Sequence, residues 1–207
     1  MIIGLNGRMQ SGKDTVATIL GSLYENVERV AFADKLKDSA AAALQVTRKD
    51  LEDLKLHGKL TISFPYLDNR NAWKMGKEIS GREYLQYYGT EAHRDIFGDD
   101  FWVEQVLDKP VTDGTILIVT DMRFPNEISG VIDRGGIAVK IRRKEADDKP
   151  ILHPSEQTLP DADFDYFLDN NGTLQDLQLN VLSMIKWIEE NRPQYRFIPT
   201  LKAGAWA

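Results

Sequence analysis

The feature of this chain that most constrains its fold is a loop between two glycines near the N-terminus. Residues 7–15 read GRMQSGKDT and follow an apolar opening, MIIGL, that is typical of a strand. The pattern G-x-x-x-x-G-K needs Gly7 and Gly12 because backbone N–H groups must turn inward around phosphate oxygens without a Cβ in the way. The segment Asp14–Tyr24 has helical apolar spacing, so a helix N-terminus would point its partial positive charge at the same place. Strand, loop and helix predict a phosphate-binding loop in which Lys13 reaches the β- and γ-phosphates.

The residue after the loop lysine departs from the usual pattern. A Ser or Thr normally holds Mg²⁺ there, whereas this chain has Asp14, with Thr15 next. A carboxylate at this place adds negative charge beside the ion, so it would hold Mg²⁺ or its waters, or help to orient an acceptor. The sequence leaves both roles of Asp14 open.

Length and composition exclude several classes of protein. The 207 residues are enough for one large domain with a core of its own, and the net charge of −6 argues against a general affinity for nucleic acid. There are no cysteines, so disulfides, thiolate metal sites and cysteine nucleophiles are excluded. No apolar run approaches the roughly 20 residues that cross a bilayer. We expect a cytoplasmic protein that binds small molecules rather than nucleic acid or a membrane.

Strand-like and helical patterns alternate along most of the chain. This alternation predicts an α/β fold with helices on both faces of a parallel five-stranded sheet. The run TILIVT is apolar throughout, as in a central strand covered on both sides. The predicted strands are Met1–Leu5, Val27–Phe32, Thr115–Thr120, Ile137–Ile141 and Asp165–Leu168. The predicted helices are Asp14–Tyr24, Lys35–Leu44, Arg48–Lys55, Gly81–Phe97, Phe101–Leu107, Phe124–Arg134 and Thr173–Glu190, the last with a capping-box-like start at Thr173 and Asp176.

One domain is predicted over residues 1–207, with its core at about 1–56 and 98–190. The stretch His57–Ser80 has no clean period, and we interpret it as an insertion or mobile lobe. Residues 191–207 would form a tail that packs on the body or binds a neighbour.

Charged residues follow several of the predicted strands, where open α/β sheets bind their ligands. Asp121 ends the central strand, where P-loop NTPases hold Mg²⁺ or its water, and its alternative role is to cap the helix at 124–134. Arg142 and Arg143 follow the next strand, where an arginine would neutralise charge on a transferring phosphoryl group, or where both would form a solvated surface run. His153 and Glu156 lie in a polar cluster that could close over substrate, although a lone histidine is more often an ordinary loop residue.

The predicted helix at 81–97 carries a polar face. Four of its side chains recur at i, i+4 spacing, namely Arg82, Gln86, Thr90 and Arg94. They would share one face that reads a base and grips its phosphate, unless Gly89 interrupts the helix. The tyrosines at 84, 87 and 88 are better explained by packing. Lys37 is a further candidate phosphate contact, against the simpler interpretation as an exposed lysine.

Together these segments identify a family. The chain resembles the deoxynucleoside monophosphate kinases of tailed bacteriophages, within the P-loop nucleoside monophosphate kinase superfamily, in GRMQSGKDT, FADKLKD, REYLQYYGTE-AHRDIFGDDFW, TDMRFPNE, HPSE and NNGTLQDL. The resemblance extends from Met1 to about Glu190. It implies the P-loop kinase fold, with a monophosphate-binding lobe at about 57–97 and a lid at about 142–157. It also implies that the γ-phosphoryl group of ATP passes, with Mg²⁺, to a deoxynucleoside monophosphate; a homodimer stays open.

The resemblance further implies roles for single residues. The ATP phosphates and their metal would be bound by Gly12, Lys13, Asp14 and Thr15. Gly7 and Ser11 of the same loop are further candidates for ATP binding, and Asp121 stays a candidate metal ligand because of its place after the strand. The acceptor would contact Lys37, Arg82 and Arg123. Gln86, Thr90 and Arg94 stay candidates from the helix face alone. The lid arginine would be Arg142 or Arg143. The adenine would face the loop that contains Asn170, Gly172 and Thr173. The family's H-x-x-E cluster corresponds to His153 and Glu156.

Three other functions stay in competition. The GKD loop also occurs in phosphomevalonate kinases and the NNG loop resembles that of dephospho-coenzyme A kinases, so another phosphorylated acceptor is the closest alternative. The block at 82–102 favours the nucleotide family. A regulatory GTPase is disfavoured because the chain has no N-K-x-D motif. A nucleotide-binding protein without catalysis is disfavoured by Lys13, Asp121 and the arginine pair.

Overall fold

The computed structural model describes residues 1–67, 73–109, 111–148 and 159–192. The chain folds into two compact units. The larger consists of Met1–Phe32 and the chain from Val103 onward, and the smaller consists of Ala33–Trp102. Separate clusters of buried apolar side chains lie in each unit.

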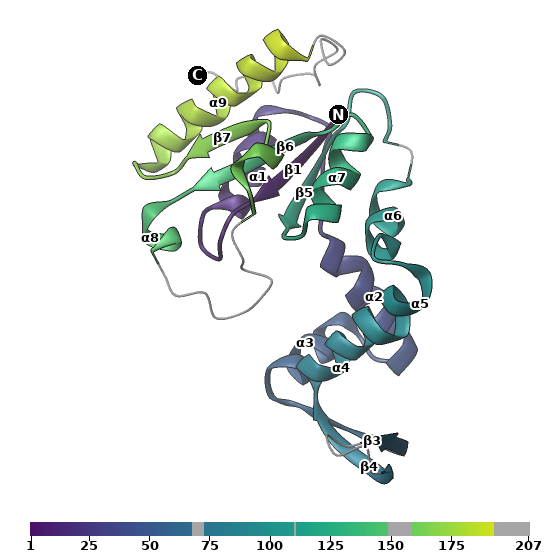
Figure 1. The fold of residues 1–207 in the computed structure, drawn as a ribbon. Coiled ribbons are helices and arrows are strands. Elements are labelled where there is room, and N and C mark those ends of the chain that lie inside the picture. Colours follow the sequence, from purple (N-terminus) through teal and green to yellow (C-terminus); the bar gives the residue numbers. More distant parts are fainter. Residues whose placement is uncertain (68–72, 110, 149–158, 193–207) are drawn as a thin grey trace. The chain divides into compact units, whose positions relative to one another are not determined.

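The larger unit is built on a five-stranded sheet in the order β2-β5-β1-β6-β7, and all neighbouring strands are parallel (Figure 1). The strands are β1 (Ile2–Asn6), β2 (Val27–Val30), β5 (Ile116–Met122), β6 (Ile137–Arg142) and β7 (Tyr166–Asp169). This arrangement confirms the predicted α/β fold with a parallel five-stranded sheet. Because β1 is the central strand, the loop that follows it lies between the ends of β5 and β6.

Helices cover both faces of this sheet, which explains why its central strands are apolar throughout. On one face, Ile3 and Leu5 pack with α1 (Lys13–Leu23) and α9 (Leu174–Asn191). On the other face, Ile2 packs with α6 (Phe101–Leu107) and α7 (Pro125–Asp133). Successive side chains of a strand point to opposite faces, so β1 contributes to both cores. Two short segments, α8 (Lys144–Asp147) and the 3-10 turn η3 (Asp161–Asp163), follow β6 and precede β7.

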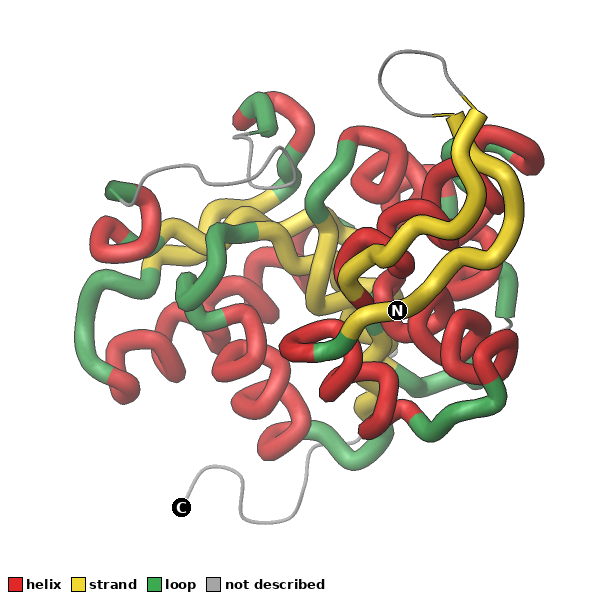
Figure 2. The backbone as a smooth tube through the Cα atoms, turned by 90° about the horizontal axis from the view of Figure 1, so that it is seen from below, coloured by secondary structure: helices red, strands yellow, loops and turns green. Residues whose placement is uncertain are grey.

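The smaller unit contains a β-hairpin that the sequence did not predict. Strands β3 (Lys59–Leu67) and β4 (Trp73–Ser80) pair antiparallel, and Figure 2 shows them as two long yellow strands. The described part of His57–Ser80 is therefore regular, contrary to its pattern in the sequence, whereas its interpretation as an insertion or mobile lobe stays a prediction. The strands pair mainly with each other and not within a larger sheet, so their side chains give no uniformly apolar run. Exposed Lys59 and Glu78 instead form an ion pair across the hairpin at 2.7 Å.

The helices of the smaller unit are α2 (Phe32–Leu44), which begins in the larger unit, α3 (Arg48–His57), α4 (Gly81–Gly89) and α5 (Asp95–Phe97). A π-helical turn, η1 (Thr90–Arg94), separates α4 from α5, so the single helix predicted at 81–97 was wrong. A π turn contains more residues than an α turn. The i, i+4 repeat of the polar face is therefore interrupted after Thr90, before it reaches Arg94.

The predicted capping box of the last helix is confirmed. The Thr173 hydroxyl accepts a hydrogen bond from the Asp176 N–H at 3.2 Å, and the Asp176 carboxylate accepts one from the Thr173 N–H at 2.8 Å. The hydrogen bond from the Thr173 hydroxyl is the main cause that holds the pKa of Asp176 below its ordinary value. The tail predicted at 191–207 lies outside the described residues, apart from Asn191 and Arg192.

We expect Thr173→Ala to lower the free energy of unfolding by about 1 kcal/mol, because the Asp176 N–H at the start of α9 loses its hydrogen-bond acceptor. In a chain of this size that corresponds to a melting temperature about 2–4 °C lower in a thermal scan. Ser183→Ala is the matched control, since its hydroxyl only donates to a carbonyl one turn back in the same helix. Equal losses from both variants would contradict this role of the cap.

Candidate active site

The loop between β1 and α1 has the geometry that the sequence predicted. Gly7 and Gly12 adopt φ values of 155° and 104°, in the left-handed half of conformational space. A Cβ at Gly7 would lie 2.5 Å from the Ser11 Oγ, and a Cβ at Gly12 would lie 2.3 Å from the Asn170 Nδ2. Any side chain at either position would therefore be strained and would also collide with its neighbour. The loop leads directly into the first turn of α1, whose unpaired N–H groups favour an anion.

Lys13 lies across this loop. Its ammonium group donates to the carbonyls of Gly7 at 2.6 Å and Arg8 at 2.9 Å. The amine is thus held at the loop itself, where the sequence predicts the phosphates of ATP. Ser11 is fully buried in the loop, and its hydroxyl has no hydrogen-bond partner among the described residues.

Asp14 points towards a strand beside the loop. Its carboxylate forms an ion pair with Arg29 of β2 at 2.8 Å, and the side chain of Asp14 is 88% exposed. A carboxylate so accessible to solvent can exchange this partner at little cost, since exposed pairs contribute at most about 1 kcal/mol. The predicted metal role of Asp14 stays a prediction.

Asp121 binds the start of a helix other than the one considered from the sequence. Its Oδ1 accepts a hydrogen bond from the Phe32 N–H, the first residue of α2, at 2.8 Å. The helix after β5 is capped instead by buried Glu127, whose carboxylate accepts from the N–H groups of Arg123 at 2.6 Å and Phe124 at 3.1 Å. The alternative that Asp121 caps the helix at 124–134 is therefore wrong. Its bond to Phe32 also explains why α2 begins earlier than Lys35 and β2 ends earlier than predicted.

The two candidate lid arginines have different surroundings. The Arg142 guanidinium lies 4.0 Å from the centre of the Phe167 ring and pairs with Asp161 at 2.7 Å. Arg143 Nη1 instead lies 3.5 Å from the carbonyl oxygen of Gln10, in the phosphate loop, and its Nη2 pairs with Glu145 at 2.9 Å. Among the contacts that the structure describes for Arg142 and Arg143, the contact with the phosphate loop belongs to Arg143.

A hydrogen bond from Lys140 is the main cause that holds the pKa of Asp161 below its ordinary value, and Arg142 adds to it. The Asp161 carboxylate is therefore kept ionised, and it holds the Arg142 guanidinium in an ion pair. The first turn of the predicted lid is also attached to the loop, because Arg8 Nη1 donates to the Asp147 carbonyl at 2.5 Å. Residues 149–158 of the lid, with His153 and Glu156, lie outside the described residues.

The loop after β7 supports the phosphate loop. The Asn170 amide donates to the carbonyl of Ser11 at 2.8 Å, and the Asn171 Oδ1 accepts from the Lys144 N–H at 2.7 Å. A Cβ at Gly172 would lie 2.5 Å from the Asp176 carboxylate, and Thr173 caps α9. Sequence reasoning singled out this segment but missed its bond to the loop, because the two partners are 159 positions apart. The predicted contact with adenine stays a prediction.

The predicted acceptor residues differ in how far their side chains are exposed. Lys37 is only partly exposed and pairs with Glu52 at 2.6 Å, so the simple interpretation as an exposed lysine was wrong. Arg82, Gln86 and Thr90 are exposed, whereas Arg94 in the π-helical turn is half-buried. Arg123, in the larger unit, is exposed just beyond the end of β5.

The tyrosines of α4 include packing residues, as the sequence indicated. Tyr84 and Tyr88 lie against the small core of Ala40, Ala41 and Leu51.

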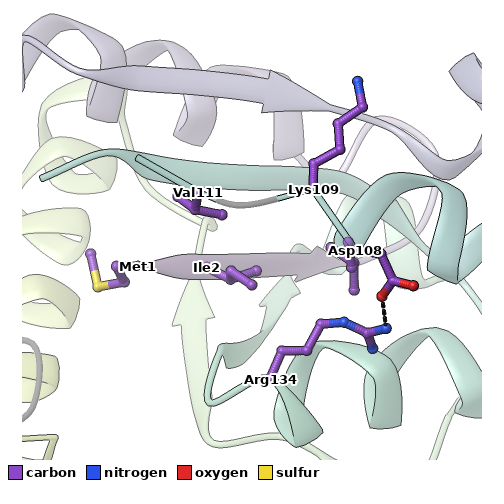
Figure 3. Close-up of a pocket in the computed structure, with 7 residues that line it drawn as sticks. Met1, Ile2, Asp108, Lys109, Val111 and Arg134 are labelled. Carbon is purple, nitrogen blue, oxygen red and sulfur yellow. Dashed lines mark hydrogen bonds and ion pairs between the residues drawn. The ribbon is translucent and has the colours of Figure 1, made fainter. Parts of the chain in front are cut away.

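A cavity of about 340 Å³ lies at the start of β1 (Figure 3), whereas the phosphate loop follows the end of this strand. Met1 and Ile2 at the start of β1 line it, together with Leu107, Asp108, Lys109, Val111 and Arg134. Figure 3 shows Asp108 and Arg134 as an ion pair at its edge. Ligands of open α/β sheets bind beyond the carboxyl ends of the strands, so this cavity is not part of the candidate site.

A family model matches a large part of the chain. The model of the deoxynucleotide monophosphate kinases matches residues 62–181, which is more than half of the 207 residues. The chain belongs to the deoxynucleotide monophosphate kinase family. It is therefore a kinase of nucleotide substrates, which confirms the predicted enzyme class and the predicted family. The bacteriophage origin stays a prediction.

Two relatives of this kinase align over most of its length. A protein of Acanthamoeba polyphaga mimivirus with the name "Putative deoxynucleotide monophosphate kinase" is 26% identical over 192 residues, 89% of this chain and 96% of the relative. The dephospho-CoA kinase of Corynebacterium glutamicum is 24% identical over 197 residues, 88% of this chain and 97% of the relative. The match of the family model begins after the phosphate loop. No helix in the described part of the kinase is both long and apolar enough to cross a membrane.

Proposed function

We propose that this kinase transfers the γ-phosphoryl group of ATP to a deoxynucleoside monophosphate and so forms the diphosphate. The observation that carries the proposal is the loop after β1, where two glycines without room for a Cβ, the ammonium group of Lys13 and the start of α1 lie together. Such a loop suits a chain of phosphates rather than a single carboxylate. The family supports a monophosphate as the acceptor.

In this reaction an oxygen of the acceptor monophosphate attacks the γ-phosphorus, and the bond from that phosphorus to the bridging oxygen of ADP breaks. The protein has little covalent work to do, because positioning and neutralisation of charge lower most of the barrier. Lys13 would hold the β- and γ-phosphates. Arg143, 3.5 Å from the loop carbonyl of Gln10, would neutralise the charge that develops on the transferring group.

Mg²⁺ is part of the proposal. Asp14 and Asp121 offer carboxylate oxygens, the hard ligands that this ion prefers, and Thr15 adds a hydroxyl in the first turn of α1. Within the part of the chain that the structure describes, no three acidic or histidine side chains gather into a metal site. That fits an ion held by one or two carboxylates together with phosphates and water. When bound, the ion would neutralise charge on the phosphates.

A different phosphorylated acceptor is the second candidate. The relative from Corynebacterium glutamicum carries the name dephospho-CoA kinase and aligns over nearly its whole length. The same loop chemistry would serve that acceptor, so only the acceptor site distinguishes the two functions.

The decisive experiment is a coupled ADP-release assay with ATP and Mg²⁺, in which dAMP, dCMP, dGMP, dTMP, dUMP, the ribonucleotides and dephospho-CoA are offered in turn. Turnover with one or more deoxynucleotides is expected. Turnover with dephospho-CoA alone would favour the second candidate. If the protein binds ATP but releases no ADP with any of these acceptors, both candidate functions would be contradicted.

Arg82→Ala is expected to raise KM for the monophosphate about tenfold, with KM for ATP changed much less, because this exposed side chain is a predicted phosphate contact. Steady-state kinetics with each substrate varied in turn measure both constants. Lys49→Ala is the control, since it removes another exposed cation from the same unit without a predicted role. A larger effect on KM for ATP would place Arg82 outside the acceptor site.

A further inference from the structure

Asn170 is one of few polar side chains buried in the described part of this kinase. It follows β7 directly, is 9% exposed, and its Nδ2 donates to the carbonyl oxygen of Ser11 at 2.8 Å. A Cβ on Gly12 would lie 2.3 Å from this nitrogen, so the amide leaves no room for a side chain there. The amide and the loop thus fit each other closely at the last peptide before Lys13.

The hydrogen bond fixes which way the peptide between Ser11 and Gly12 faces. In a planar trans peptide the C=O and N–H groups point in opposite directions. With the Ser11 carbonyl held by Asn170, the Gly12 N–H is therefore turned away from Asn170. Backbone N–H groups of this loop are the donors that bind phosphate oxygens.

Without Asn170 this peptide could turn over easily. Rotating the peptide plane by about 180° would take the φ of Gly12 from 104° to about −76°, while its ψ stays near 15°, a conformation in the bridge region that is allowed to glycine. The left-handed conformation seen here has no such intrinsic preference, even in glycine. After the rotation, a carbonyl oxygen would face the place where the N–H is needed, and it would repel phosphate.

The same turn also anchors the segment that carries Arg143. The Asn170 N–H donates to the carbonyl of Arg142 at 2.9 Å, and neighbouring Asn171 accepts from the Lys144 N–H at 2.7 Å. Asn170 therefore connects the phosphate loop with the end of β6, so the two stay in a fixed relation.

We propose that Asn170 is a positioning residue, which holds the Ser11–Gly12 peptide with its N–H towards the phosphates of the nucleotide. This inference rests on the proposed function. It differs from a contact with adenine, because a positioning residue affects every ligand that carries the phosphate chain, with or without a base.

The test compares the binding of ATP and of inorganic tripolyphosphate by titration calorimetry. Asn170→Ala is expected to weaken both ligands by about tenfold, the equivalent of one lost hydrogen bond. Asn170→Asp should weaken both further, because a carboxylate oxygen would then oppose the Ser11 carbonyl. In turnover, KM for ATP should rise and kcat should fall, while KM for the monophosphate stays unchanged.

Asn180 supplies matched controls. Its amide also donates to a backbone carbonyl, that of Asp169 at 3.0 Å, but it does not reach the loop in the described structure. Asn180→Ala and Asn180→Asp make the same chemical changes nearby and should bind both ligands as the unaltered kinase does. Melting temperatures are recorded for every variant, and Asn170→Asp, which keeps the shape of the side chain, decides the matter if Asn170→Ala does not fold.

Two results would overturn the proposal. One is a loss of ATP affinity with tripolyphosphate affinity intact, which would indicate a contact with the base. The other is unchanged binding of both ligands by the Asn170 variants. Failure of the unaltered kinase to bind either ligand, or equal binding by Lys13→Ala, would instead count against the proposed function of the loop.

Discussion

Replacing Lys13 by alanine is expected to lower kcat about 10³-fold while the fold is retained. The ammonium group lies within hydrogen-bond reach of the carbonyls of Gly7 and Arg8, so its charge is held at the phosphate loop. Among the loop residues predicted to bind the ATP phosphates, Lys13 is the one that carries a positive charge. The coupled ADP-release assay measures the change, and a thermal scan measures the fold.

Lys186→Ala is the control for this experiment. Lys186 is 75% exposed on α9, and its ion pair with Glu190 is long, at 3.9 Å. Its replacement therefore removes a positive charge at a place outside the phosphate loop. Lys13→Met keeps most of the aliphatic stem and serves if the alanine variant is unstable. A kcat near that of the unaltered kinase in both Lys13 variants would show that the phosphate loop has been assigned wrongly.

Replacing Arg143 by alanine is expected to lower kcat about 10²–10³-fold, with KM values changed much less. The guanidinium is next to the loop carbonyl of Gln10 and would act mainly on charge that develops during transfer. Arg143→Lys should recover only part of the rate, since lysine keeps the charge but loses the planar fork of donors. Steady-state kinetics of the three proteins test this order.

Arg142→Ala is the matched control, and we expect a kcat within a few-fold of the unaltered kinase. Arg142 pairs with Asp161 and lies over the Phe167 ring, so its loss should appear in the melting temperature instead. If Arg142→Ala lowers kcat as strongly as Arg143→Ala, the contacts seen here do not distinguish the two arginines during turnover. If neither variant lowers kcat, the arginine that acts on the transferring group lies elsewhere.

The sequence predicted the larger unit better than the smaller. The apolar strands around β1 and the helices beside them have strong periodic patterns, because each is buried on a defined face. The hairpin of β3 and β4 was missed because two strands that pair mainly with each other have no uniformly apolar run. The π-helical turn after Gly89 was missed because one extra residue in a turn leaves no clear signature in the sequence.

The phosphate loop, the parallel sheet and the family could be predicted without coordinates, since they depend on glycines, apolar runs and motifs that are local in the chain. Contacts between distant segments of the folded chain show which side chains lie together. Arg143 rather than Arg142 contacts the phosphate loop, Glu127 rather than Asp121 caps α7, and Asn170 binds the carbonyl of Ser11. These contacts connect residues on different elements, and no spacing along the chain specifies which partner a charged or amide side chain meets once the sheet has formed.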